Sequence, residues 1–264
     1  MTSPFEKSRW LTCAGIKTFV AETGIGPPLV FLHGNPDTHE AWNGVVEQLK
    51  SQFTCYAPDL PGYGQSDPQD DVSFEKQVEW VGALLTGLGL ERPHLVIHDV
   101  GSNYGFAFTA KHPERVGKLT IFNGSFFPDF EWHFWGKVWR VPVLGELTML
   151  LGNRTLFVKE TMKGSPTLPR EYAERNYDSY GKKTRKQVLT FYRWLDPKKF
   201  TGWDTLLLAA LKTLPAQVIW GDQDPYIPAR TADRFGVKVH RYPQYGHWVM
   251  VEAPVDVAAH IRAL

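Results

Sequence analysis

The stretch from residue 94 to residue 105 constrains the fold of this chain more than any other. It reads His-Leu-Val-Ile-His-Asp-Val-Gly-Ser-Asn-Tyr-Gly, so an apolar run stops at a carboxylate, Asp99, and helix-compatible sequence follows. This ending is typical of a buried strand that turns sharply into a helix. In such a turn the polar side chain is exposed at the carboxyl end of the strand, and the first amides of the helix point toward it. We therefore predict that Asp99 lies at a functional edge of a sheet.

Apolar strands and amphipathic helices alternate on both sides of this turn. Strands are predicted at 16–20, 29–32, 53–57 and 118–122, and helices at about 42–49, 74–88 and 99–112. Continuous apolar runs such as Leu29-Val-Phe-Leu32 are typical of strands that are buried on both faces of a parallel sheet. The alternation indicates βαβ units with right-handed crossovers. We expect an α/β fold with a mostly parallel twisted sheet flanked by helices.

The alternation stops between residues 125 and 214, where aromatic residues are frequent and no strand pattern occurs. It resumes with strands at 217–220 and 237–242 and a closing helix from about residue 255. We therefore predict a core domain made of residues 1–124 and 215–264, with a helical cap at 125–214. Ligands bind beyond the carboxyl ends of strands in open parallel sheets, so a cap at that edge predicts a pocket beneath it.

Charge and composition exclude several classes of function. The formal net charge of +1 leaves no basic surplus for a nucleic-acid partner. Cys13 and Cys55 match no metal spacing and are interpreted as buried thiols. No apolar run approaches the 18 residues of a membrane span, and the first residues lack the apolar segment of a secretory signal. We expect a cytoplasmic protein that needs no metal or cofactor, and the oligomeric state stays open.

Three polar residues follow predicted strands in the order Asp99, Asp224, His247. Each has an ordinary structural explanation by itself, because the two carboxylates could cap loops and the histidine could lie on the surface. A nucleophile, however, needs a base within hydrogen-bond reach, and the base needs an acid that fixes its tautomer. The occurrence of a nucleophile, an acid and a base in this order at the ends of consecutive strands favours a functional role over coincidence.

An ordered series of short motifs carries a resemblance to a known family. The motifs are His33-Gly34-Asn35-Pro36, Asp59-Leu-Pro-Gly-Tyr-Gly-Gln-Ser66, His98-Asp99-Val100-Gly101, His112-Pro-Glu-Arg-Val116, Gly221-Asp-Gln-Asp224 with Pro228, and Gly246-His247. Over essentially its full length the chain resembles an α/β-hydrolase with a helical cap inserted after the sixth strand. With Asp in the place of the usual Ser nucleophile, it is similar to haloalkane dehalogenases, epoxide hydrolases and haloacetate dehalogenases rather than to esterases.

The resemblance implies a role for each residue. Asp99 would attack an sp³ carbon and form an ester, His247 would activate the water that cleaves the ester, and Asp224 would orient His247. The backbone amides of Asn35 and Val100 would form the oxyanion site.

Five other residues were weighed for these roles. Asp222 is a rival acid, Asn123 cannot act as an acid, Ser102 is a lesser candidate nucleophile, and His33 and His98 are interpreted as structural.

The substrate is predicted to be small and neutral, with a haloalkane ranked first among the alternatives. Asn35 matches a halide-binding residue of many haloalkane dehalogenases, but Val100 stands where most of them have a halide-binding Trp. Trp132, Trp135 and Trp139 recur at helical spacing, so they could share one face and donate indole N–H groups, or simply pack the cap onto the core. No Arg follows the nucleophile to hold a haloacid carboxylate.

The remaining cap aromatics leave an epoxide hydrolase as the main alternative. Tyr192 resembles one of that family's two cap tyrosines, and Tyr177 or Tyr180 would have to replace the other because residues 125–171 contain no Tyr. His133 and Trp248 are further candidates for the pocket. A third interpretation is a ligand-binding homologue with weak or no turnover.

Overall fold

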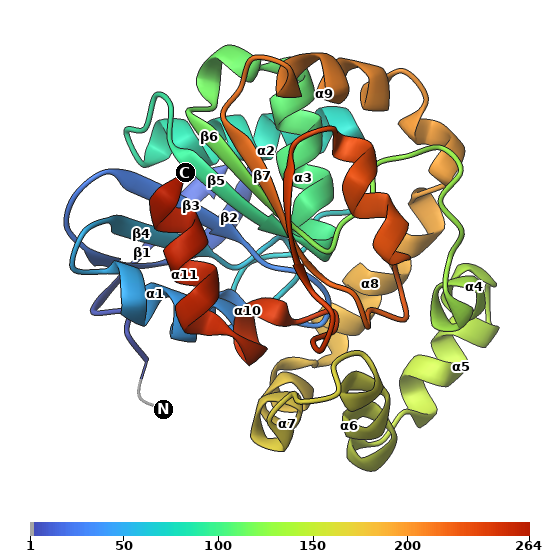
Figure 1. Cartoon of the computed structure of the whole chain (residues 1–264). Coiled ribbons are helices and arrows are strands. Elements are labelled where there is room, and N and C mark those ends of the chain that lie inside the picture. Colours follow the sequence, from blue (N-terminus) through green and yellow to red (C-terminus); the bar gives the residue numbers. More distant parts are fainter. Residues whose placement is uncertain (1–2) are drawn as a thin grey trace.

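A computed structural model of the chain describes residues 3–264, and these residues form an eight-stranded sheet with helices on both faces (Figure 1). The strand order is β1-β2-β4-β3-β5-β6-β7-β8. The first pairings, β1 with β2 and β2 with β4, are antiparallel, and the others are parallel. The strands are β1 (Lys7–Cys13), β2 (Ile16–Gly24), β3 (Pro28–Leu32), β4 (Thr54–Pro58), β5 (His94–His98), β6 (Lys118–Phe122), β7 (Ala216–Gly221) and β8 (Lys238–Tyr242). The predicted α/β architecture with a mostly parallel sheet is confirmed.

The edge strand β1 was not predicted from the sequence. Most of its side chains are exposed, so it lacks the apolar pattern that marks the central strands. It pairs with β2 from Lys7 opposite Glu22 to Cys13 opposite Ile16, which also extends β2 beyond the predicted five residues.

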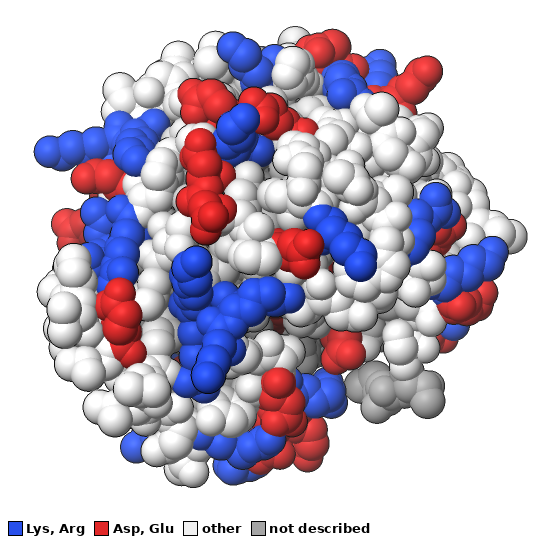
Figure 2. Space-filling model, turned by 180° about the vertical axis from the view of Figure 1, so that it is seen from behind, with Lys and Arg blue, Asp and Glu red and all other residues white. Residues whose placement is uncertain are grey.

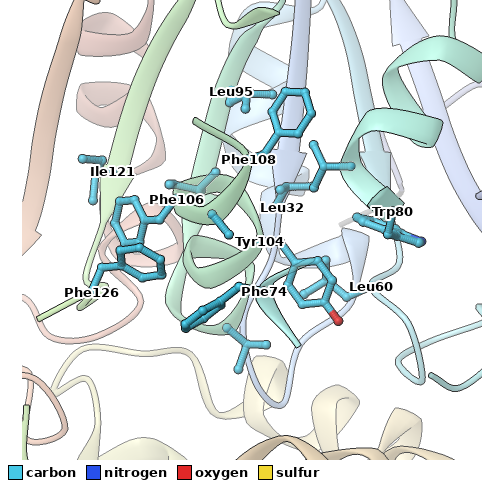
Figure 3. Packing of buried hydrophobic residues seen from close by; sticks show 14 of the residues in the cluster. Leu32, Leu60, Phe74, Trp80, Leu95, Tyr104, Phe106, Phe108, Ile121 and Phe126 are labelled. Carbon is cyan, nitrogen blue, oxygen red and sulfur yellow. The ribbon is translucent and has the colours of Figure 1, made fainter. Parts of the chain in front are cut away.

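Helices cover both faces of the sheet and bury two apolar cores. On one face lie α1 (Asn43–Leu49), α10 (Val249–Glu252) and α11 (Pro254–Ala263). On the other lie α2 (Phe74–Gly87), α3 (Asp99–Lys111) and α9 (Trp203–Leu211). Figure 3 shows the second core, where Phe74, Tyr104 and Phe126 pack beneath the sheet residues Leu32 and Ile121. Rigid packing on both faces fixes the strand ends from which the polar residues project.

The α2 helix illustrates how local sequence defines these elements. Ser73 caps its first turn, because the Ser73 hydroxyl accepts a hydrogen bond from the backbone N–H of Lys76 at 3.4 Å. Trp80, Val81 and Leu84 follow at helical spacing and are fully buried against the sheet.

The helical cap lies between β6 and β7 and covers the carboxyl ends of the strands (Figure 1). It contains α4 (Phe134–Arg140), α5 (Leu144–Leu151), α6 (Arg154–Lys163), α7 (Arg170–Ser179) and α8 (Lys182–Trp194). The predicted cap, 125–214, also included α9, but α9 packs against α3 on the core. We therefore propose that the cap ends before α9. Short 3-10 helices are η1 (His39–Trp42), η2 (Pro113–Arg115), η3 (Pro197–Phe200) and η4 (Ala229–Phe235).

The surface carries both signs of charge. Figure 2 shows Lys and Arg side chains interspersed with Asp and Glu over the face opposite to that of Figure 1. Among residues 3–264, no helix is long and apolar enough to cross a membrane.

Candidate active site

Asp99 occupies a strained turn between β5 and α3. Its φ of +46° lies in the left-handed region, which a residue other than glycine rarely adopts. The turn also brings Gly101 against β3, where its N–H donates to the His33 carbonyl at 2.9 Å. A Cβ on Gly101 would collide with the carbonyl oxygens of His33 and Leu32, so only glycine fits there. This close approach directs the Asp99 side chain out of the carboxyl end of the sheet.

The Asp99 carboxylate is held by backbone amides. The N–H of Asn35 donates to Oδ2 at 2.8 Å, and the N–H of Val100 also bonds this carboxylate. Burial raises the pKa of Asp99, although the positive charge of His247 and the two amides oppose the rise. The side chain keeps 20% of its surface exposed, toward a cavity. The two amides predicted from the sequence to form an oxyanion site therefore both bond the Asp99 carboxylate.

His247 and Asp224 meet Asp99 as the sequence predicted. The His247 Nδ1 atom lies 2.7 Å from Asp224 Oδ2, and its Nε2 atom lies 4.0 Å from Asp99 Oδ2. Burial by itself lowers the pKa of His247, but Asp224, together with Asp99, raises it to about 9. Because Asp224 accepts the Nδ1 proton, Nε2 is the nitrogen that faces Asp99 and the cavity.

Asp224 is fixed from both sides, which the sequence did not reveal. Its Oδ1 accepts the backbone N–H groups of Tyr226 at 2.7 Å and Ile227 at 3.1 Å. Its Oδ2 also accepts the side-chain amide of Asn123 at 2.8 Å. The rival acid, Asp222, instead forms an ion pair with Arg241 at 2.7 Å. Asn123 therefore supports the acid from the neighbouring strand end.

The other residues weighed for these roles, Ser102, His33 and His98, do not line the cavity in front of Asp99. Ser102 is fully buried, and its hydroxyl has no hydrogen-bond partner among residues 3–264 and does not line the cavity. His33 accepts the backbone N–H of Leu60 at 3.0 Å, and burial lowers its pKa to about 4. His98 bonds the His247 carbonyl through Nε2 at 2.9 Å. Burial also lowers the pKa of His98 well below its ordinary value, which favours the neutral form of both histidines.

A cavity of about 150 Å³ opens in front of Asp99 and beneath the cap. The seven cap and loop residues proposed from the sequence all line it: Trp132, His133, Trp135, Tyr177, Tyr180, Tyr192 and Trp248. Asn35 lines it as well, whereas Val100 borders a smaller hollow of about 30 Å³ beside Asp99. The space suits a small, mainly apolar molecule.

The comparisons with known proteins agree with the fold. A family model described as alpha/beta hydrolase fold matches residues 27–152. The chain is 24% identical over 296 aligned residues to a cis-3-alkyl-4-alkyloxetan-2-one decarboxylase from Shewanella oneidensis, covering 98% of this chain and 88% of that protein. It is 29% identical over 241 residues to a haloalkane dehalogenase from Mesorhizobium japonicum, covering 83% of this chain and 76% of the other. The crystal structure of epoxide hydrolase VrEH1 from Vigna radiata matches with a TM-score of 0.77 and 22% identity, covering 97% of each chain.

The chain has the α/β-hydrolase fold. Its relatives include hydrolases that act on different small molecules, and the chain is a hydrolase with this fold.

The tryptophans of this hydrolase do not form the single helical stripe that their spacing suggested. The α4 helix begins at Phe134, so Trp132 precedes it, and Trp135 and Trp139 stack within it at 6.2 Å. His133 is the N-cap, accepting the backbone N–H of Gly136 at 3.3 Å. All three indoles nevertheless line the cavity.

The polar groups facing the cavity differ in their availability to a ligand. Trp135 Nε1 donates to Glu160 at 3.0 Å, and the Tyr180 hydroxyl contacts the Met149 sulfur at 3.5 Å. Trp132 Nε1, by contrast, is buried and has no acceptor in the described part of the chain. The Tyr192 hydroxyl lies 3.4 Å from the His133 ring, and burial raises the pKa of Tyr192 well above its ordinary value. Trp132 is therefore an available donor, whereas the Tyr192 hydroxyl already contacts the His133 ring and the Asn35 side chain.

Sequence reasoning missed other residues at the site. Tyr226 packs its ring edge-to-face against His247, with centroids 5.1 Å apart. Asp37 is a buried carboxylate behind the histidine, and nothing in its sequence context marks it as special. Within residues 3–264, no group of three His, Cys, Asp or Glu side chains could hold a metal ion.

Proposed function

We propose that this hydrolase cleaves a small, neutral, mainly apolar substrate through an ester on Asp99, and that its reaction is the hydrolytic dehalogenation of a haloalkane. The observation that carries the proposal is the position of Asp99. Its carboxylate faces an apolar cavity while His247 Nε2 lies 4.0 Å away. A carboxylate displaces a leaving group from an sp³ carbon, whereas a Ser nucleophile suits acyl transfer.

In the first step, an Asp99 oxygen forms a bond to the substrate carbon, and the carbon–halogen bond breaks. The halide leaves with the bonding electron pair and needs hydrogen-bond donors in an apolar pocket. Asn35 and Trp132 line the cavity and supply an amide and an indole N–H. Trp132 thus replaces the donor that Val100 does not provide.

In the second step, water attacks the ester carbonyl, and the neutral form of His247 takes the proton at Nε2. The ester has removed the charge of Asp99, one of the groups that raise the pKa of His247 to about 9, so the neutral form is favoured more after the first step. Negative charge then develops on Oδ2, which already accepts the Asn35 backbone N–H at 2.8 Å. Asp224 stabilises the imidazolium that forms. The bond between the carbonyl carbon and the alkyl oxygen then breaks, the His247 imidazolium gives its proton to that oxygen, and an alcohol leaves while the Asp99 carboxyl group is restored.

An epoxide hydrolase is the second candidate, and Tyr192 is the observation in its favour. An opening epoxide oxygen needs a proton, and a phenol beside Asp99 supplies one. Tyr180, however, points to Met149, and Tyr226 donates to the Glu160 carbonyl at 3.2 Å. The aromatic side chain that packs against Tyr192 beside Asp99 is the Trp132 indole. An indole N–H can bond a halide anion, but it does not protonate an alkoxide. This pairing favours halide over epoxide.

Halide release from short bromo- and chloroalkanes tests the proposal. We expect release by the wild type, none by Asp99→Ala, and a mass increase on the Asp99 peptide of His247→Phe, because the ester forms but is not hydrolysed. Asp222→Asn is the matched control, since its carboxylate lies in the same loop and pairs with Arg241.

The same assay distinguishes the alternatives. Conversion of styrene-like epoxides to diols without halide release, lost in Tyr192→Phe, would favour the epoxide hydrolase. The panel includes a β-lactone, because the name of the Shewanella relative refers to an oxetan-2-one. Failure of every substrate to form an adduct would favour a ligand-binding homologue.

A further inference from the structure

Asp37 holds a carboxylate that the proposed reaction does not use. Its side chain is 1% exposed and accepts three hydrogen bonds. Tyr172 and Asn176 donate to Oδ1 at 2.5 and 2.7 Å, and the Trp248 indole donates to Oδ2 at 3.0 Å. Within residues 3–264 no Lys or Arg pairs with it, and the His98 Nδ1 atom lies 3.9 Å from Oδ2. Burial raises the pKa of Asp37 to about 6, although the three hydrogen bonds and the charge of His247 oppose the rise.

The three donors come from two different parts of the molecule. Tyr172 and Asn176 belong to α7 of the cap, whereas Trp248 directly follows the proposed base, His247. Asp37 itself lies two residues after Asn35, in the loop that supplies the oxyanion amide. One carboxylate therefore joins the cap, the oxyanion loop and the base loop.

The backbone of the base loop is tied to the same region of the cap. The His247 N–H donates to the Gly164 carbonyl at 2.7 Å, and the Trp248 N–H donates to the Ser165 hydroxyl at 2.9 Å. Gly164 and Gly246 pack so closely that a Cβ on Gly246 would collide with the Gly164 carbonyl. The position of His247 thus depends on cap residues 164–176 as well as on the sheet.

We infer that Asp37 is a positioning residue that fixes the base, His247, by locking α7 of the cap to the loop that follows β8. The inference concerns the base of the proposed reaction and so rests on that function for its kinetic consequences. The contacts of Asp37 with α7 and with Trp248, on which the inference is based, do not depend on the identity of the substrate.

An Asp37→Asn substitution removes the lock with little change in volume. The three donors face two oxygen atoms, and an amide offers one oxygen and one NH₂ group. The NH₂ group must therefore face either the Trp248 indole or the pair of cap donors, and two donors in contact repel. The negative charge that Asp37 places near His247 disappears as well.

A purely structural Asp37 would have different consequences. Loss of packing alone lowers stability and slows both chemical steps together. Misplacement of the base affects the hydrolysis of the ester, because the attack by Asp99 does not need His247. A displacement of 1 Å at a reacting group costs on the order of 100-fold in rate.

The first measurement is an NMR titration of the histidine side chains, with His247 assigned by comparison with His247→Gln. Asp224, Asp99 and Asp37 all raise the pKa of His247. We expect Asp37→Asn to lower the pKa of His247. Tyr172→Phe should lower this pKa by a smaller amount or broaden the titration curve less, and Asp222→Asn should leave the pKa unchanged. A His247 curve in Asp37→Asn that superimposes on the wild-type curve would overturn the inference, whatever the substrate proves to be.

The second measurement separates the two chemical steps by rapid quenching and mass spectrometry with a bromoalkane. We expect Asp37→Asn to keep the burst of halide while ester hydrolysis slows by on the order of 100-fold. Equal slowing of both steps in the folded variant refutes positioning. Tyr172→Phe is the milder variant if Asp37→Asn does not fold, and it should slow only hydrolysis. Absence of a burst in the wild type refutes the proposed function instead, and the titration then decides the inference.

Discussion

Replacing Asp224 by Asn isolates the contribution of the acid to the second chemical step. The pKa of His247 is raised from 6.5 to about 9, and a change of that size corresponds to about 3 kcal/mol of added stability for the imidazolium. Asp224 is the largest of the groups that raise it, at 2.7 Å from Nδ1. Losing most of this stabilisation slows a step that creates the imidazolium by on the order of 100-fold. An Asn side chain can also impose the wrong tautomer, which increases the loss.

Pre-steady-state kinetics with a bromoalkane measure this effect. Ester formation creates no charge on His247, so the halide burst of Asp224→Asn should stay within about threefold of wild type, while ester hydrolysis becomes the slow step and adduct accumulates. Asp222→Asn serves as the control because its carboxylate bonds Arg241 outside the cavity. The reasoning is refuted if Asp224→Asn hydrolyses the ester at the wild-type rate, or if burst and hydrolysis slow by the same factor.

Three further outcomes follow from the geometry. Trp132→Phe should slow the halide burst by about 10- to 100-fold, which is the effect of losing one hydrogen bond to a charged group. Trp135→Phe should not slow it, because that indole already bonds Glu160. Equal bursts in the two variants would exclude Trp132 as a donor. Gly101→Ala should lower the free energy of unfolding by about 1–3 kcal/mol in chemical denaturation, whereas Gly181→Ala, whose Cβ would meet nothing within 4 Å, should be neutral. Because the pKa of His247 is about 9 in the fold and 6.5 in free imidazole, its stabilisation is complete below pH 6.5 and lost as the pH rises through 9; thermal unfolding should show this decline in the wild type and a weaker one in Asp224→Asn.

Much of the fold was predictable because the central strands are buried on both faces. Their continuous apolar runs, separated by helical spacing, leave few alternatives to a parallel sheet. The exposed edge strand β1 gave no such signal, since solvent tolerates any side chain there. The end of the cap is hard to predict for a related reason, because the apolar face of α9 is equally compatible with packing on the cap or on the core.

The reacting groups of the candidate site were predictable for a different reason. Strand ends in a parallel sheet meet at one edge, so polar residues that follow those strands come together whatever the loops do. Groups that act through other groups lack this signature. Asn123 bonds Asp224 across 101 positions of sequence, and Asp37 bonds Tyr172 across 135. No local sequence pattern encodes such contacts.

The contacts made by residues 164–165 divide the cap into two parts with different freedom to evolve. The helices that line the cavity contribute side chains, which can be exchanged to suit new ligands while the backbone stays in place. The Gly164 carbonyl instead holds the N–H of His247, so shortening or lengthening the chain at this point would move the base itself. Chimaeras that exchange α4 to α6 with those of a relative should therefore keep their chemistry, provided that the crossover leaves the segment from Gly164 to Asn176 intact.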